Sequence, residues 1–255
     1  MECCFLCPSP ASLGCSACPT KSCSPAHLAQ HRPSSSCRPF TIHTVPGVGR
    51  CLLASRPILP GEEVLAEQAA VVGPNQQGRP LCLACLRPAD LSFLCPSCSF
   101  PFCDQACLQG AEELHAAECE VLSRAPAPDL GPGSSAHHAI LPLRLLLFLE
   151  HHPDQAKLVT RLMTHAEEKA SKDYWPVSQV HVVDFLLEQC DQAARWSRDQ
   201  VTDAVTLLEV NGFEIESYPG GGFRGLYPSL ASLTSHSCTP NCLSVVDTCP
   251  PYTNR

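Results

Sequence analysis

The sequence lacks any dense run of lysine and arginine, and its 25 acidic residues outnumber its 17 basic ones for a formal net charge of −8. Binding to nucleic acid without sequence preference depends on neutralising phosphates with basic side chains. The charge therefore argues against binding through the phosphate backbone, and direct sequence-specific nucleic-acid binding is not expected either. It suits a basic protein or peptide partner better.

Long apolar segments are also missing. The longest apolar run, near residues 141–149, contains Arg144 and is far shorter than the roughly 20 residues that span a bilayer. The first ten residues, MECCFLCPSP, show no basic stretch followed by an apolar stretch, so no signal peptide is predicted. We therefore expect a cytoplasmic or nuclear protein without a membrane partner. A chain of 255 residues with 44% hydrophobic content can still bury one substantial core.

Cysteine, by contrast, is abundant, with 19 residues. Many fall in Cys-x2-Cys pairs, a spacing that favours metal binding over disulfides in a reduced compartment. Four ligand pairs lie between residues 81 and 120: Cys82 and Cys85, Cys95 and Cys98, Cys103 and Cys107, and His115 and Cys119. Tetrahedral zinc takes four thiolate or imidazole ligands, so these eight predict two Zn²⁺ ions. The pairs separated by three residues are spaced for one face of a helix.

Residues 1–38 hold a second and less regular array. Its candidate ligands are Cys4, Cys7, Cys15, Cys18, Cys23, His27, His31 and Cys37. The first six repeat the order of the central array, whereas the last two have altered spacing, and Cys3 leaves the first ligand ambiguous. We expect an internal repeat of the zinc module with two further ions. The alternatives are a disordered cysteine-bearing tail and a single-zinc remnant.

The secondary-structure signals indicate an α+β fold. Strands are predicted at 41–45, 50–54 and 64–72, with turns at 46–49 and 60–62. A Pro/Gly-rich linker at 121–135 leads into a helical region at 136–210, where apolar residues recur at helical spacing. A further strand is predicted at 211–215, followed by a glycine turn at 220–222.

Several motifs resemble those of a known family. The array from Cys82 to Cys119 resembles a MYND zinc finger, spacing for spacing. The sequence HSCTPN at 236–241 resembles the N-H-S-C-x-P-N signature of SET-domain lysine methyltransferases. Segments 49–50, 211–215 and 225–228 follow in the order that SET proteins place them. A SET domain split by a MYND finger is similar to the SMYD family, and the N-terminal finger and the sequence LLEVNGFEI are most similar to the arthropod SmydA/msta group.

The resemblance implies an architecture for the whole chain, a SET β-fold split by a MYND zinc finger. The expected parts are a degenerate MYND-like finger at 1–38, the N-terminal SET part at 39–78, the MYND finger at 79–120, a helical insert at 121–205 and the SET core at 206–255. The family's G-E-E-I segment, its channel tyrosine and its cysteine-rich tail have no counterpart before Arg255. We therefore expect a C-terminally truncated chain.

The resemblance also implies a function, protein-lysine methylation with S-adenosylmethionine as cofactor and a histone or another lysine-bearing protein as substrate. The matching cofactor-binding positions are Gly49, Arg50, Asn211, His236 and Asn241. Tyr227 would line the lysine channel at the catalytic site, and Cys238 would bind an additional zinc. Since no metal takes part in methyl transfer, the zinc ions would be structural.

Two departures and several alternatives stay open. Ser235 replaces the first asparagine of the signature, and Cys51 replaces the glycine that usually follows the Gly49-Arg50 pair. Core packing could explain Tyr227, and a turn-stabilising role after proline could explain Asn241. A different function is a non-catalytic scaffold whose MYND finger recruits a proline-rich peptide. A DNA-binding zinc finger is the least favoured reading, because no basic recognition helix is present.

Overall fold

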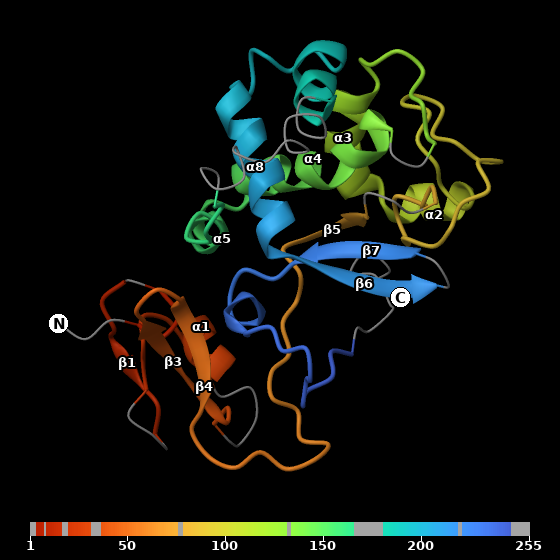
Figure 1. The fold of residues 1–255 in the computed structure, drawn as a ribbon. Coiled ribbons are helices and arrows are strands. Elements are labelled where there is room, and N and C mark those ends of the chain that lie inside the picture. The colour runs from red at the N-terminus through yellow and green to blue at the C-terminus, as the bar shows by residue number, and fades with distance from the viewer. Residues whose placement is uncertain are drawn as a thin grey trace. The chain divides into compact units, whose positions relative to one another are not determined.

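The computed structural model describes residues 4–7, 9–16, 20–31, 37–75, 79–131, 134–165, 181–218 and 221–245 (Figure 1). The chain divides into two compact units. The first, here the N-terminal unit, combines Met1–Gln68 with Tyr227–Leu243. The second, here the central unit, contains Ala69–Leu226 and Ser244–Arg255. Helices and antiparallel strands occur together, as the α+β prediction requires.

The N-terminal unit begins with the small elements that carry the first cysteine array. Strand β1 (Leu13–Gly14) pairs antiparallel with β2 (Lys21–Ser22), and helix α1 (Pro25–His31) follows. Cys4, Leu6, Phe40 and Leu230 form a buried cluster beside these elements. Because this cluster joins the array to strands and loops from elsewhere in the unit, the described part of the array is packed rather than a loose tail.

A β-hairpin forms the centre of the N-terminal unit. Strand β3 (Phe40–Val45) pairs with β4 (Gly49–Ala54), with Val45 opposite Gly49 and Phe40 opposite Ala54. Gly47 and Gly49 have φ angles of 77° and 92°, in the left-handed region that glycine adopts without strain. The predicted strands at 41–45 and 50–54 and the turn between them are confirmed.

The strand predicted at 64–72 is wrong over most of its length. Residues 63–69 form no regular structure, and strand β5 covers only Val71–Pro74. The carbonyls of Val64 and Ala66 accept hydrogen bonds from the Arg38 guanidinium, at 3.5 and 3.2 Å. A buried cation thus takes the acceptors that a neighbouring strand would otherwise use.

The central unit contains a three-stranded antiparallel sheet in the order β5–β7–β6. Strand β6 (Gly212–Tyr218) forms a hairpin with β7 (Gly221–Leu226), which confirms the strand predicted at 211–215. Strand β7 also pairs with β5, with Val71 opposite Leu226. The two neighbouring strands β5 and β7 therefore come from opposite ends of the continuous stretch Ala69–Leu226.

Helices of the central unit cover the sheet (Figure 1). They are α2 (Gln105–Gly110), α3 (Glu112–Leu122), α4 (Ser135–His151), α5 (Pro153–Val159), the π-helix η1 (Phe185–Gln189) and α8 (Arg198–Asn211). The short 3₁₀-helix η2 (Ala231–Leu233) belongs to the N-terminal unit. Parts of the predicted helical region, at 166–180, lie outside the described residues.

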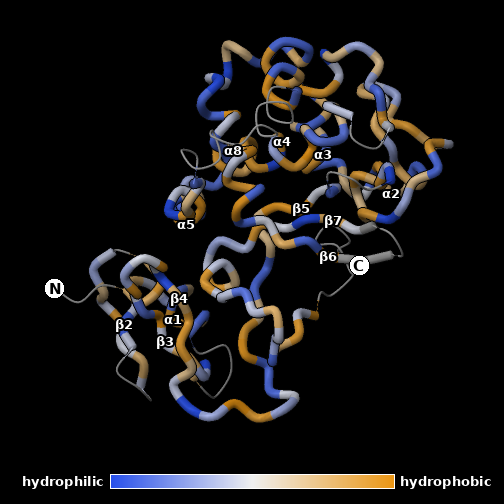
Figure 2. The backbone as a smooth tube through the Cα atoms, in the orientation of Figure 1, coloured by the Kyte–Doolittle hydropathy of each residue, from blue (hydrophilic) through white to orange (hydrophobic). Residues whose placement is uncertain are grey.

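Helix α4 is the core element of the central unit. It is apolar along most of its length (Figure 2), and nearly every residue from Ala136 to Leu147 is buried. It packs so closely on β5 that a Cβ added at Gly73 would lie 3.0 Å from the Cβ of Leu141. A helix that is apolar on all sides is expected at the centre of a fold. Of the helices in the described ranges, none is long and apolar enough to cross a bilayer.

The start of α4 contains a buried histidine. Ser134 caps the helix by accepting from the His137 backbone N–H at 3.2 Å. The His137 ring Nε2 lies 3.1 Å from the Asn75 carbonyl, to which it donates. Burial lowers the pKa of His137, with a smaller contribution from His138 and an opposing one from the carbonyl.

We predict that His137 makes stability depend on pH. Its pKa is lower in the folded state, so the unfolded chain binds the proton more tightly and stability falls as pH drops below about 6.5. In His137→Gln, urea midpoints measured at pH 7.5, 6.5 and 5.5 should therefore change less with pH than in the wild type. His151→Gln, at the exposed far end of the same helix, is the matched control and should keep the wild-type slope. An unchanged slope in His137→Gln would contradict the assignment.

Candidate metal centres and cofactor residues

The central Cys/His module, defined here as residues 81–122, gathers its eight predicted ligands into two groups. The first group is Cys82, Cys85, Cys103 and Cys107, and the second is Cys95, Cys98, His115 and Cys119. Within each group the ligand atoms all lie within 4.8 Å of one another. The first ligand pair joins the third, and the second joins the fourth, so the two groups interleave along the chain.

Two similar turns present the Cys-x2-Cys pairs. In one, the Leu86 N–H donates to the Cys82 carbonyl at 2.9 Å; in the other, the Ser99 N–H donates to the Cys95 carbonyl at 2.8 Å. Leu86 and Ser99 both have a positive φ, 56° and 62°. Non-glycine residues hold such angles only where the surroundings over-determine them. The two turns are thus local structural repeats.

The pairs separated by three residues are presented in two different ways. Helix α3 carries both His115 and Cys119, one turn apart on one face, as predicted. Cys103 instead precedes α2, whose N-cap Asp104 accepts from the Cys107 N–H at 2.8 Å. The expectation of a shared helical face is therefore right for the last pair and wrong for the third.

The ligand separations fit tetrahedral zinc. Bond lengths of about 2.3 Å to sulfur and 2.05 Å to nitrogen give tetrahedral edges of about 3.8 Å for S–S and 3.6 Å for S–N. The separations are 3.5 Å for Cys85–Cys103, 3.8 Å for Cys95–Cys119 and 3.6 Å for Cys98 Sγ–His115 Nε2. The module can therefore bind zinc without rearranging these ligands.

The pKa values of the ligand thiols shift in both directions: the hydrogen bond with Cys82 lowers the pKa of Cys85 to about 4. Burial raises the pKa of Cys98, and burial together with the neighbouring Cys85 raises the pKa of Cys103 to about 12. A thiol must lose its proton to bind metal, and a bound divalent ion supplies the positive charge that makes this favourable.

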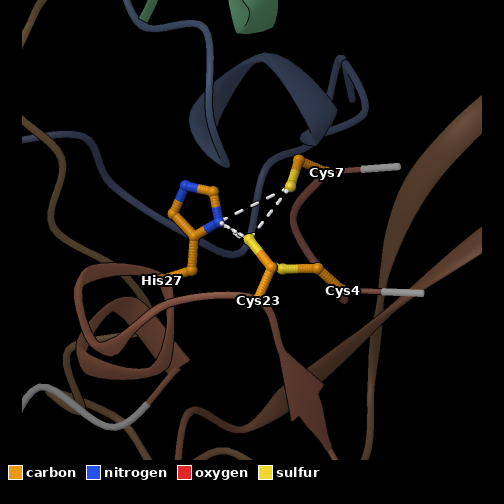
Figure 3. A group of neighbouring side chains, drawn as sticks. All are labelled: Cys4, Cys7, Cys23 and His27. Atoms are coloured by element: carbon orange, nitrogen blue, oxygen red, sulfur yellow. Dashed lines mark hydrogen bonds between the residues drawn. The ribbon is translucent and has the colours of Figure 1, made fainter. Parts of the chain in front are cut away.

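The N-terminal array, residues 4–37, forms two further groups. The third group consists of Cys4, Cys7, Cys23 and His27, whose sulfur and nitrogen atoms converge in Figure 3. His27 Nδ1 lies 3.3–3.6 Å from the three sulfurs, and Cys7 and Cys23 are 3.4 Å apart. These separations also fit tetrahedral zinc. Cys4 thus fills the first ligand position, and Cys3 lies outside the described residues.

A fourth group contains Cys15, His31 and Cys37. The two sulfurs are 3.6 Å apart, and the buried His31 ring meets Phe5 edge-on at 5.5 Å. The predicted fourth ligand, Cys18, lies outside the described residues.

Most of the residues that match the SET cofactor site lie in the N-terminal unit. Gly49, Arg50, His236 and Asn241 all belong to it. An added Cβ at Gly49 would meet nothing within 4 Å, which leaves room for a ligand beside the backbone. Asn211 instead ends α8 in the central unit.

The side chain of Asn211 is engaged with its own unit. Its Nδ2 donates to the carbonyls of Leu207 and Met163, each at 2.9 Å. These bonds hold the end of α8 to the segment that follows α5.

The signature segment 235–241 is exposed throughout. His236 Nε2 lies 3.4 Å from Cys238 Sγ. Within the described residues, Cys238 joins no cluster of three or more potential metal ligands.

The sequence did not point to Glu67, a residue of the N-terminal unit. The carboxylate of Glu67 accepts backbone N–H bonds from Ser229 at 2.7 Å and from Leu230 and Ala231 at 2.8 Å. These donors lie between Tyr227 and the signature. Burial, helped by the charge of Glu67, raises the pKa of Tyr227. No local pattern could have revealed a carboxylate whose partners lie more than 160 residues along the chain.

The fold and the Cys/His groups together define the class of this protein: an α+β protein that contains candidate zinc-binding modules. No protein-family model matches the chain. It is 29% identical over 224 residues to SET domain-containing protein SmydA-8, isoform A, of Drosophila melanogaster, covering 84% of this chain and 45% of that protein. It is 24% identical over 219 residues to Histone-lysine N-methyltransferase ASHR1 of Arabidopsis thaliana, covering 81% and 44%.

The chain is thus similar over most of its length to SET domain-containing proteins of the SmydA type and to a histone-lysine N-methyltransferase. It spans less than half of the length of the curated relatives that it matches.

We predict that Glu67→Gln destabilises the N-terminal unit by about 2 kcal/mol, because an amide cannot accept three backbone donors as a carboxylate does. Thermal unfolding would measure the change. Glu63→Gln removes the same charge from an exposed neighbour and is the matched control. Equal midpoints in the two variants would show that the three hydrogen bonds contribute little.

Proposed function

We propose that the protein is a protein-lysine methyltransferase that uses S-adenosylmethionine. The observation that carries the proposal is homology over 81% of the chain to a protein named as a histone-lysine N-methyltransferase, together with the retained sequence HSCTPN at 236–241. The acidic net charge suits a lysine-bearing, basic protein substrate, a histone or another protein.

The cofactor would supply an activated methyl group, and the protein would supply alignment. In-line transfer to the lysine amine requires donor and acceptor to be held in one geometry. Gly49, Arg50, His236 and Asn241 would hold the cofactor, with Gly49 providing the open backbone approach. The amine must also lose its proton, which a desolvated channel favours.

Tyr227 would line that channel as a neutral side chain. Because burial and Glu67 raise the pKa of Tyr227, its phenol stays protonated near neutral pH. It is therefore unsuited to act as a base at that pH, and orientation of the amine is the role that its chemistry supports.

We also propose that the central module is a MYND finger inserted between the two parts of a SET fold. Support comes from the sheet, because β5 precedes the module, β7 follows the helices, and yet the two strands are hydrogen-bonded neighbours. The zinc ions, two in the central module and two in the N-terminal array, would be structural. A proline-rich peptide at the finger remains an expectation from the family resemblance.

We predict that the chain binds close to four equivalents of zinc. Metal analysis of the purified protein should show one equivalent less for Cys4→Ser, which removes a ligand of the third group. Cys238→Ser, outside the four groups, should leave the content unchanged. A wild-type value of two or fewer would remove the N-terminal array from the proposal.

We predict that this chain alone methylates weakly, because its signature segment is exposed and methyl transfer needs a water-excluded site. S-adenosylmethionine should nevertheless bind in calorimetry, at least about tenfold less tightly to Gly49→Ala. Gly61→Ala is the matched control, since Gly61 also has a positive φ and open space at its Cβ. Equal losses in both variants would contradict a cofactor contact at Gly49, and no binding by the wild type would count against the cofactor assignment.

A further inference from the structure

A fully buried carboxylate lies directly behind the second metal group. Glu118, on α3, places Oε2 3.3 Å from His115 Nδ1. Its Oε1 accepts from Arg144 Nε at 2.5 Å, and Oε2 lies 3.4 Å from Arg144 Nη2. The side chains of Glu118 and Arg144 are each 1% exposed.

This carboxylate determines how the histidine can serve a metal. His115 Nε2 points to the second group, 3.6 Å from Cys98 Sγ. With Nδ1 donating its proton to Glu118, the lone pair is left on Nε2. A carboxylate behind a ligating histidine fixes the ring orientation and tautomer and raises its basicity as a ligand.

The arginine extends the same network into the fold. Arg144 Nη1 donates to the Val72 carbonyl of β5, and Nη2 donates to the Leu83 carbonyl, both at 2.7 Å. Leu83 lies between two ligands of the first group, and Arg144 itself lies on α4. One guanidinium therefore contacts α3, the first cysteine turn and the sheet.

The two charges depend on each other. Burial alone would raise the pKa of Glu118, but Arg144 and the His115 hydrogen bond hold the pKa of Glu118 below its usual range. Breaking a buried ion pair from one side leaves an uncompensated charge, which is strongly destabilising. Loss of Glu118 should therefore disturb the contacts of Arg144 with the Val72 and Leu83 carbonyls, and loss of Arg144 should disturb the contact of Glu118 with His115.

We infer that Glu118 and Arg144 are positioning residues that couple zinc binding at Cys95, Cys98, His115 and Cys119 to the packing of β5 and of the first cysteine turn. With zinc bound, His115 is fixed, its N–H is aimed at Glu118, and the carboxylate holds Arg144 against both carbonyls. When the ion is lost, the ring can turn and the network loses its anchor. This role is independent of methyl transfer.

The first test follows zinc release from the 255-residue chain to a coloured chelator. In Glu118→Gln, one equivalent per chain should leave about 10–100-fold faster than in the wild type, and the remaining equivalents should keep their rates. Glu113→Gln removes an exposed charge from the same helix and should release zinc as the wild type does. Unchanged release from Glu118→Gln would overturn the inference, as would equal acceleration of all equivalents.

Combined variants identify the site. In a Cys98→Ser background, where the second group has already lost a ligand, Glu118→Gln should add no further fast equivalent. In a Cys82→Ser background, which alters the first group, it should add one. Additive effects in both backgrounds would place the action of Glu118 elsewhere and overturn the assignment.

The second test measures hydrogen exchange in strand β5 of the sheet. Arg144→Lys keeps the charge but cannot bridge three partners as the planar guanidinium does. Hydrogen exchange at residues 71–73 should rise in the wild type when the zinc of the second group is removed. In Arg144→Lys it should be high before removal, and one zinc should also leave faster. If Arg144→Lys exchanged faster in β5 but released zinc at the wild-type rate, Arg144 would have a packing role alone, and the coupling would be refuted.

Discussion

The guanidinium of Arg144 is the contact on which the central unit depends. It is almost fully buried, and its donors reach a carboxylate on α3, a carbonyl of β5 and a carbonyl within the first cysteine turn. Few side chains other than arginine can serve three directions at once, because the group is planar, always charged and carries five donors. The desolvation of this charge is offset because it is paired with Glu118 and hydrogen-bonded on its other edges.

The N-terminal unit uses a similar device with different surroundings. Arg38 directly follows Cys37 of the fourth metal group, and it donates to the carbonyl of Gln30 in α1 and to those of Val64 and Ala66. Burial lowers the pKa of Arg38, yet guanidinium keeps its charge at any physiological pH. In both units, therefore, a buried cation that binds backbone carbonyls helps to attach a cysteine-rich module to the fold.

Spacing predicted the local features of this protein and not its long-range ones. Cys-x2-Cys pairs and the His115–Cys119 interval carry their geometry within a single turn of chain, so the ligand groups could be anticipated. The hairpin around Gly47 is equally local. The strand predicted at 64–72 followed from the β-branched and apolar residues there. Its competing partners, Arg38 and the backbone of residues 229–231, cannot be seen in that stretch of sequence. The pairing of Glu118 with Arg144 was hidden for the same reason.

The adjacency of β5 and β7 has a consequence for how the molecule assembles. Val71 and Leu226 are partners in the sheet although the whole central module and its helices lie between them. Closing so long a loop is entropically unfavourable and is rewarded only after the intervening segments are compact. On a ribosome, β5 emerges long before β7, with an open edge that can pair with other chains. Zinc binding to the module would compact the segment that separates the two strands, and so would lower the entropic cost of bringing β7 to that edge.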